Sequence, residues 1–236
     1  MHENAFQLWV GRQPRQAVVM YVPSADRGTA DDVLRLLDEA ALVTLVAVDG
    51  DEPVVVPTPF SLQRTADGGT WPVIEVHLHR NNPFWSAVAD GGPVTVSVLG
   101  PYAFIPHDWN PRSGAPPEDG VPTSWYAAAS LRCRAELVEE PGELAGLVGR
   151  LVERVEPAGL DHSIDPAARP YGPLLGAIRG VRLHVEDVVA KSKFGGTRAP
   201  EQRRDVIGRL VARARPGDAA VVDWARRALD RDTSAS

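Results

Sequence analysis

The sequence predicts an α+β domain in the form of a small β-barrel decorated by helices. About six short segments alternate apolar and polar residues, with the period of two that is typical of half-buried strands. Helical segments lie between them, but not in the regular strand–helix alternation of a parallel α/β fold. Two amphipathic segments, at about 201–214 and 218–230, predict a pair of helices at the C-terminal end.

The first half of the chain predicts an arm, a helix and most of the strands. Residues 1–19 show no clear period, so an irregular arm is expected there, with Met20 as an alternative start. Acidic residues at the beginning of an apolar helical spacing are typical of a helix start. Apolar runs on both sides of Asp49-Gly50-Asp51 predict a hairpin. The expected elements are a helix at 31–41, strands at 42–48, 53–60, 73–79 and 94–98, and a short helix at 83–89.

The second half begins with a loop. Residues 108–123 are rich in proline, glycine and aspartate, and a long loop of this kind in a compact domain is often functional. The remaining expected elements are a long strand or bent hairpin at 125–138, a helix at 143–155, a turn at 174–178 and a last strand at 181–188. Residues 20–236 are therefore expected to form a single domain with a helical segment at about 200–230.

Composition and charge exclude several classes of protein. The only cysteine, Cys133, excludes an internal disulfide, a cysteine-ligated zinc site and an iron–sulfur cluster. No apolar run approaches the roughly 18 residues that a membrane span needs, and the N-terminus lacks the features of a secretory signal. A cytoplasmic location is therefore expected. The net charge of −6 argues against nucleic acid as a partner.

The first candidate site lies where a strand leads directly into a helix. The alternation of Val73 to His79 places Glu75, His77 and His79 on one face. Asn82 suits an N-cap, and Pro83 suits the first helical position, where a missing N–H costs nothing. Two imidazoles beside the positively polarised start of a helix can hold a cofactor. The competing interpretation is a pair of polar histidines on a solvent-facing strand.

The second candidate site contains the only lysines of the chain, Lys191 and Lys193. They begin a segment, residues 191–215, that has eight basic and two acidic residues. All other basic side chains that are not histidine are arginines, and only lysine can lose its proton when it is partly buried. The lysine pair therefore indicates a need for the amine itself.

Five motifs, in order over residues 20 to about 213, are similar to one family. They resemble the PaiB-type FMN-binding negative transcriptional regulators, which implies the flavin-binding split-barrel fold of pyridoxamine-phosphate oxidases and a homodimer. The motifs are Met20-Tyr21-Val22-Pro23, the stretch from His77 to Trp85, Gly100-Pro101-Tyr102-Ala103-Phe104-Ile105, Val121-Pro122-Thr123 followed by Trp125-Tyr126, and the segment from Lys191 to Arg198 that runs into Asp205-Val206-Ile207.

The departures from the family pattern favour haem over a flavin. The family typically has His-Leu-Ala-Arg-Ala-Asn-Pro where this chain adds His79, and Gly195 and Gly196 replace polar residues that suit flavin contacts. A haem needs one axial imidazole, an apolar slot and cations for its propionates, and glycines let a planar group approach the backbone. In this the chain resembles the piperazate synthases, a haem b-dependent branch of the family. FMN is the alternative cofactor.

The resemblance implies that the chain is an enzyme of natural-product biosynthesis. The implied reaction forms an N–N bond by dehydrative cyclisation of L-N5-hydroxyornithine, a hydroxylated ornithine, to L-piperazate. His79 is the predicted iron ligand, with His77 and then His107 as alternatives, and Glu75 is the expected acceptor for the other ring N–H. A negative transcriptional regulator that binds FMN and a metal enzyme that uses His77 and His79 as a ligand pair are the rival hypotheses.

Lys191 and Lys193 are the predicted catalytic residues. The reaction needs a proton donor for the departing oxygen and a base for the α-amine, and a lysine near the iron with a pKa lowered by burial can fill either role. His2, His162 and His184 are assigned no function. The other predicted cofactor contacts are Arg80, Trp85, Trp125, Tyr126 and Arg198.

Overall fold

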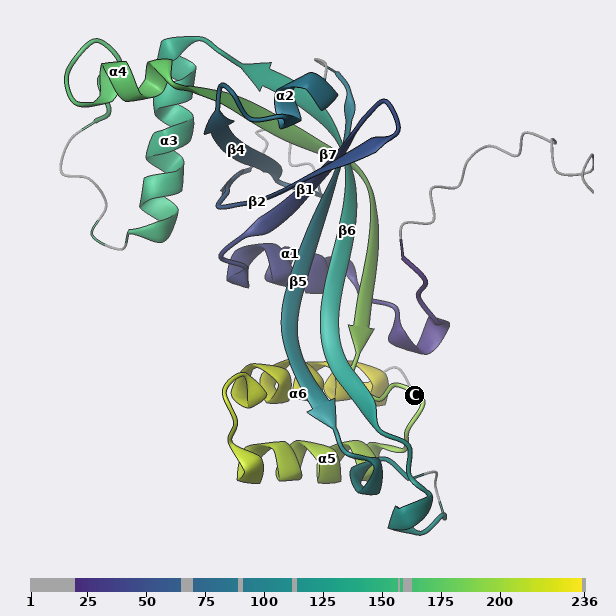
Figure 1. Ribbon diagram of the computed structural model, residues 1–236. Coiled ribbons are helices and arrows are strands. Elements are labelled where there is room, and N and C mark those ends of the chain that lie inside the picture. The colour runs from purple at the N-terminus through teal and green to yellow at the C-terminus, as the bar shows by residue number, and fades with distance from the viewer. Residues whose placement is uncertain are drawn as a thin grey trace, which may run out of the picture.

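The computed structural model contains one antiparallel sheet with helices around it (Figure 1). The structure describes residues 20–64, 70–88, 91–111, 114–156, 158 and 163–234. The expected arm at 1–19, His2 and His162 lie outside these residues, as does the turn that Asp67-Gly68-Gly69 is expected to form. The strand order is β2-β1-β5-β6-β7-β4-β3. The strands are β1 (Val43–Asp49), β2 (Glu52–Thr58), β3 (Ser61–Gln63), β4 (Val73–His79), β5 (Pro93–Ile105), β6 (Thr123–Val138) and β7 (Ile178–Lys193).

The helices occupy both ends of the sheet. In Figure 1, α3 and α4 lie at the upper end, while the long strands β5, β6 and β7 run down to the C-terminal pair, α5 and α6. The helices are α1 (Ala30–Glu39), α2 (Phe84–Ala87), α3 (Pro141–Val155), α4 (Tyr171–Gly176), α5 (Pro200–Arg213) and α6 (Asp218–Ser234), with short 3-10 turns η1 (Ser24–Asp26), η2 (His107–Trp109) and η3 (Pro117–Asp119). The predicted class, an α+β split barrel with C-terminal helices, is confirmed, and the sheet is not closed.

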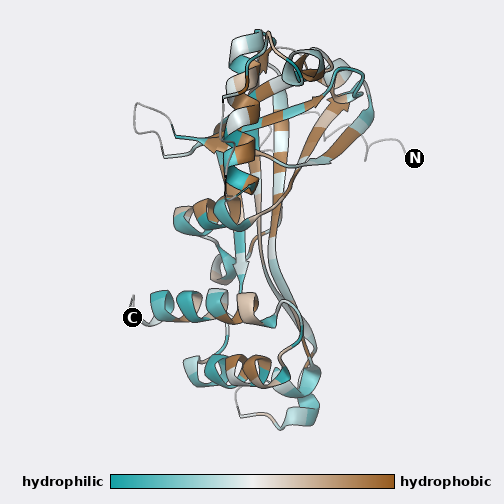
Figure 2. Ribbon diagram, turned by 90° about the vertical axis from the view of Figure 1, so that its left-hand side faces the viewer, coloured by the Kyte–Doolittle hydropathy of each residue, from teal (hydrophilic) through white to brown (hydrophobic). Residues whose placement is uncertain are grey.

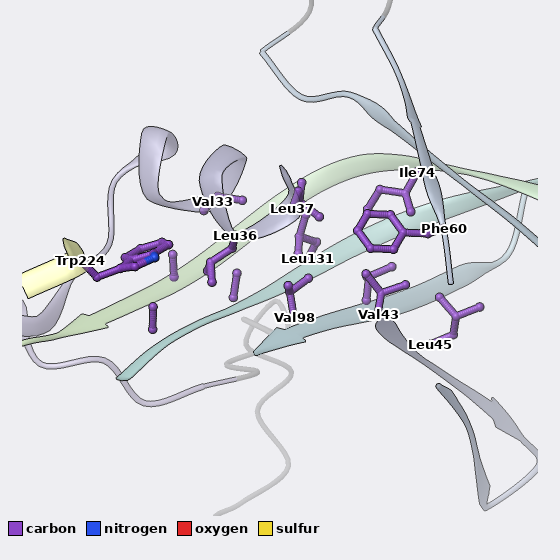
Figure 3. Close-up of a cluster of buried hydrophobic side chains, with 14 of the residues drawn as sticks. Val33, Leu36, Leu37, Val43, Leu45, Phe60, Ile74, Val98, Leu131 and Trp224 are labelled. Atoms are coloured by element: carbon purple, nitrogen blue, oxygen red, sulfur yellow. The ribbon is translucent and has the colours of Figure 1, made fainter. Parts of the chain in front are cut away.

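The main core lies between one face of the sheet and the helices that cover it. Leu36 and Leu37 of α1 are almost fully buried beside Val98 and Leu131 of the sheet, and Trp224 of α6 closes one end (Figure 3). Burial of each such leucine contributes about 1.5–3 kcal/mol. Figure 2 shows that hydrophobic residues run along the strands and one side of the helices, so the helices are held by their apolar sides.

Helix α1 begins at a capping box. The Thr29 hydroxyl accepts a hydrogen bond from the Asp32 amide, and the Asp32 carboxylate accepts one from the Thr29 amide. This reciprocal arrangement satisfies two donors that would otherwise have no partner, and it fixes the helix start. The helix therefore spans 30–39, close to the expected 31–41.

Two expectations about strand length were wrong, and a third was confirmed in one of its two forms. The strand expected at 94–98 continues to Ile105, because a bulge between Leu99 and Tyr102 accommodates Gly100 and Pro101 without ending the ladder. Residues 123–138 form the single long strand β6, the first of the two expected forms, because β5 and β7 pair with it on both sides. The last strand covers 178–193 instead of 181–188, so it includes both lysines.

At the junction after β4, Asn82 makes a capping hydrogen bond, but the helix begins at Phe84, one residue later than expected. The Asn82 side chain accepts a hydrogen bond of 2.9 Å from the Phe84 amide, and Pro83 follows the cap in helical conformation. The helix itself is shorter than the expected 83–89 and covers only 84–87. Strand β3 was not predicted, and the turn expected at 174–178 is helix α4 at 171–176.

The opposite face of the sheet carries exposed apolar side chains. We call this surface the open face and define it by Val48, Val55, Leu99, Tyr102 and Phe104, whose exposed fractions run from 47% to 75%. The pairing register places all five on the side of the sheet away from the main core. Within the described residues, none of the helices combines the length and the apolar character that crossing a bilayer requires.

Candidate functional site

The candidate residues form two groups at opposite ends of β7. The histidine end contains His77 and His79 of β4 together with Arg80 and Trp85. The lysine end contains Lys191 and Lys193 of β7, Tyr126 of β6, and Tyr21 and Asp26 from the segment before α1.

At the histidine end, Glu75 is not available to a ligating histidine. Its side chain is fully buried, and its two oxygens accept hydrogen bonds of 2.6 and 2.8 Å from Arg150 and a longer one of 3.4 Å from Arg182. A carboxylate that is removed from water needs such cationic partners. The expectation that Glu75 supports a histidine is therefore wrong.

His77 is half-buried and keeps its imidazole neutral. Burial lowers its pKa, because desolvation disfavours the charged ring. Its Nδ1 is buried and has no hydrogen-bond partner among the described residues. An unpartnered buried ring nitrogen is uncommon in proteins.

His79 is exposed at the end of β4. Its Nδ1 accepts a hydrogen bond of 3.2 Å from the Asn81 amide, so the ring proton is on Nε2 in this arrangement. Ligation of iron through Nε2 requires the proton on Nδ1 instead, and therefore the loss of this bond. The bond is solvent-exposed, so its loss costs only about 1 kcal/mol.

Arg80 and Trp85 surround His79. The indole N–H of Trp85 donates to the His79 carbonyl at 2.8 Å, which fixes the ring beside the strand end. Arg80 donates from Nε to the Gly176 carbonyl at 2.7 Å and lies 3.9 Å from Glu139. Because its Nε–H already donates to a carbonyl, the guanidinium cannot use Nε and Nη together to bind an anion through two hydrogen bonds.

The lysine end is built across two strands. The register pairs Tyr126 with Lys193, and Ala128 with Lys191, so both lysines and Tyr126 share one face. The Lys191 Nζ lies 5.6 Å from the Tyr126 ring and 6.0 Å from the Tyr21 ring, and it donates to the Tyr21 carbonyl at 3.3 Å. Two tyrosine faces and a carbonyl thus hold one ammonium group.

Asp26 belongs to the lysine end, although it was not among the residues predicted from the sequence. Burial raises the pKa of its carboxyl, while the charges of Lys191 and Lys193 act in the opposite direction. The segment that carries Asp26 is attached to β7, because the Gly28 amide donates to the Ala190 carbonyl at 3.0 Å. The only sequence signal was the neighbouring motif Met20-Tyr21-Val22-Pro23, which gave no role to Asp26.

Trp125, Arg198 and His107 lie apart from this cluster. Trp125 is buried and packs edge-on against Phe194, so its ring belongs to the core between the sheet and the C-terminal helices. Arg198 donates to the Asn110 side chain at 3.0 Å and so holds the loop that follows β5. His107 is exposed in the turn η2 of that loop.

The space beside Gly195 and Gly196 is taken by the protein itself. A Cβ on Gly195 would lie 3.1 Å from the Trp125 ring, and one on Gly196 would lie 2.1 Å from the Ala25 carbonyl oxygen. Gly195 also has a positive φ of 75°. These glycines admit the segment before α1 and the core rather than a planar cofactor, which corrects their interpretation.

No cofactor can contact both ends of one chain. His77 pairs with Gly180 of β7, and the strand runs from there to Lys191. At about 3.3 Å per residue this distance is roughly 35 Å along the strand, more than a flavin or haem ring system covers. Among the described residues, no three His, Cys, Asp or Glu side chains are grouped so as to hold a metal ion.

Comparison with known proteins identifies the type of domain. Residues 20–187 match a family model described as "Putative FMN-binding domain". The flavocytochrome Anf3 from Azotobacter vinelandii is similar in structure, with a TM-score of 0.50, 17% identity, and coverage of 72% of this chain and 70% of that one. An FAD- and haem-binding protein from Mycobacterium smegmatis has a TM-score of 0.49, 23% identity, and coverage of 71% and 72%. At these identities the likeness concerns the fold alone. No curated protein matches the chain in sequence.

Proposed function

We propose that this chain, which belongs to the family described as "Putative FMN-binding domain", is a haem b-dependent enzyme that cyclises L-N5-hydroxyornithine to L-piperazate with loss of water. The observation that carries this proposal is the lysine end. There, the charges of Lys191 and Lys193, the only lysines of the chain, act on the half-buried carboxyl of Asp26. A site that moves protons needs such an arrangement, whereas a flavin-binding regulator does not.

The residues present fit a haem in their donor chemistry. Iron needs a neutral imidazole, and the histidine end offers two rings, of which His79 is exposed and His77 has a lowered pKa. We retain His79 as the proposed ligand because a large cofactor can reach its ring. Propionates need cations, which the lysine end supplies, and the apolar open face suits the ring edges. A flavin would use the same cations for its phosphate but needs no imidazole.

The chemistry divides between the cofactor and the chain. Bound haem supplies a Lewis acid that polarises the N–O bond of the hydroxylamine. We assign the Lys191 Nζ as the donor of a proton to the departing oxygen, and an Asp26 carboxylate oxygen as the acceptor of the proton of the attacking α-amine. The amine electron pair forms the N–N bond as the N–O bond breaks. One water is lost, so no external oxidant or reductant is needed.

A homodimer would bring a histidine end and a lysine end together. The register places His77 and His79 on the same face of the sheet as Lys191 and Lys193, and the exposed apolar residues of the open face lie on that side as well. A second copy packed antiparallel across this face would bury these side chains and bring the histidine end of one chain to the lysine end of the other. We propose this arrangement as the complete site.

The test is the absorption spectrum of protein produced with a supply of haem, followed by incubation with L-N5-hydroxyornithine. The proposal requires a Soret band and a product that is lighter by one water. Flavin bands without a Soret band would favour the FMN-binding regulator instead. A protein that takes up neither haem nor substrate would exclude the proposed enzyme.

A further inference from the structure

A second site lies on the other side of β7 from the lysines. A cavity of about 210 Å³ is formed by the β7 end, helices α5 and α6, and the segment before α1. Ser192 forms part of its wall, and because it stands between Lys191 and Lys193 on the strand, its side chain points to the opposite face. The cavity is therefore separate from the proposed enzymatic site and does not depend on it.

Two buried polar atoms in the wall have no partner. Arg203 is 3% exposed and Ser192 is 8% exposed, yet Arg203 Nε and Ser192 Oγ make no hydrogen bond within the described part of the chain. Leaving one buried donor unsatisfied is costly, and two in one cavity are unusual. The Arg203 Nε–H can only donate, and the Ser192 hydroxyl can donate as well as accept, so an acceptor bound in the cavity would satisfy both.

The charge of the wall favours an anion. Arg203 uses Nη1 to bind Asp232 at 2.5 Å, and Arg231 binds Asp32 through two hydrogen bonds of 3.0 Å. Arg27 also lines the cavity and adds a third guanidinium. Three arginines therefore face two carboxylates, and an arginine has no lone pair with which to coordinate a cation.

The size of the cavity restricts the ligand to a compact one. Pockets for drug-sized ligands usually have about 300–1,000 Å³, so a cavity of about 210 Å³ suits a smaller group. We propose that this cavity binds a compact oxyanion, either inorganic phosphate or a small carboxylate, through the Nε–H of Arg203 and the hydroxyl of Ser192. The bound anion joins the segment before α1 to β7 and to the C-terminal helices, so it stabilises the folded chain by mass action.

Isothermal titration of the full chain with sodium phosphate, and separately with sodium acetate, tests this site, with sodium chloride holding the ionic strength constant. We expect saturable binding of one anion per chain in at least one titration, and the anion that binds identifies the ligand class. Ser192→Ala should weaken this binding about tenfold, as expected for the loss of one hydrogen bond to a charged group.

Ser130→Ala is the matched control. Ser130 is also 8% exposed and its Oγ also has no partner among the residues that the structure describes, but it lies on the neighbouring strand β6 and does not line the cavity. The Ser130→Ala variant should bind the anion with the same affinity as the unaltered chain. Arg203→Lys, which keeps a cation beside Asp232 but loses the Nε–H, should weaken binding at least as much as Ser192→Ala.

Two results would overturn the inference. The first is the absence of saturable binding in both titrations. The second is equal affinity in the unaltered chain and in Ser192→Ala, which would place any bound anion elsewhere. If Arg203→Lys does not fold, the comparison of the two serine variants still decides, because removing an unpartnered hydroxyl should not impair folding.

Discussion

Glu75 and Arg150 join strand β4 to helix α3 through two hydrogen bonds, from Nε at 2.6 Å and from Nη2 at 2.8 Å. The carboxylate is fully buried, and Arg182 completes its environment from β7. Glu75 lies two residues before His77 on the same face of the strand, so its ion pair with Arg150 anchors the segment that carries both histidines. Its role is to hold the histidine end in place.

Arg150→Ala should therefore destabilise the fold strongly. The substitution leaves a buried carboxylate with two longer hydrogen bonds of 3.4 Å, from Arg182 and from the Ser61 hydroxyl. We expect a loss of about 3 kcal/mol in the free energy of unfolding. Denaturant unfolding followed by circular dichroism measures it. Arg204→Ala, which removes an exposed arginine paired with Glu201 on α5, should change stability by less than about 0.5 kcal/mol. Equal effects of the two would refute the anchoring role.

The neutral state of His77 should make stability depend on pH in the mildly acidic range. Burial lowers its pKa below the ordinary 6.5, so the unfolded chain binds a proton more readily than the folded chain. The contribution of neutral His77 to the free energy of unfolding is fully present above pH 6.5 and is lost as the pH falls toward the folded-state pKa. His77→Gln should flatten this part of the stability–pH curve, as measured by denaturant unfolding at several pH values. A curve of unchanged shape would exclude His77 as its source.

The two histidines should differ in their effect on cofactor retention. We expect His79→Ala to lose haem during gel filtration, because it removes the proposed ligand, while His77→Ala should retain it. The ratio of Soret absorbance to protein absorbance measures the difference. Arg204→Ala serves as a folded control with full retention. Haem that remains in His79→Ala and disappears in His77→Ala would assign the ligand to His77.

Removing one lysine charge should raise the pKa of Asp26 further. Burial already raises it, and the positive charges of Lys191 and Lys193 oppose that effect. In Lys193→Gln one opposing charge is gone, so the carboxyl should titrate at higher pH, whereas Lys193→Arg keeps the charge and should leave the pKa nearly unchanged. Carbon-13 NMR of the Asp26 carboxyl follows the titration directly. Identical titration in both variants would show that Lys193 does not act on Asp26.

Gly196 should tolerate no side chain. A Cβ there would lie 2.1 Å from the Ala25 carbonyl oxygen, so the segment carrying Asp26 would have to move away from β7. We expect Gly196→Ala to cost about 1–3 kcal/mol in thermal or denaturant unfolding. Gly208 lies in α5, and a Cβ there would have no described residue within 4 Å, so Gly208→Ala should instead stabilise by about 0.5–1 kcal/mol. Stabilisation by both substitutions would contradict the close approach.

The sequence predicted the barrel class because alternation and turn residues are local signals, and these agree with the sheet that forms. It failed where a distant segment decides the outcome. Gly100 and Pro101 look like a strand end, but pairing with β6 carries β5 past them through a bulge. The strand pattern alone makes Glu75 a partner for the histidines, whereas in the fold its carboxylate binds Arg150 of the distant helix α3. Asp26 meets the lysines only after folding, from the opposite end of the chain.

The scarcity of lysine has a practical consequence for experiments on this protein. Apart from the N-terminal amine, the only primary amines are those of Lys191 and Lys193, because every other cationic side chain except histidine is an arginine. Amine-directed reagents, such as isotopically labelled formaldehyde with a mild reductant, should therefore place their labels almost entirely beside Tyr126. The chain thus carries its own pair of spectroscopic reporters at the surface where a cofactor and a second copy are proposed to meet.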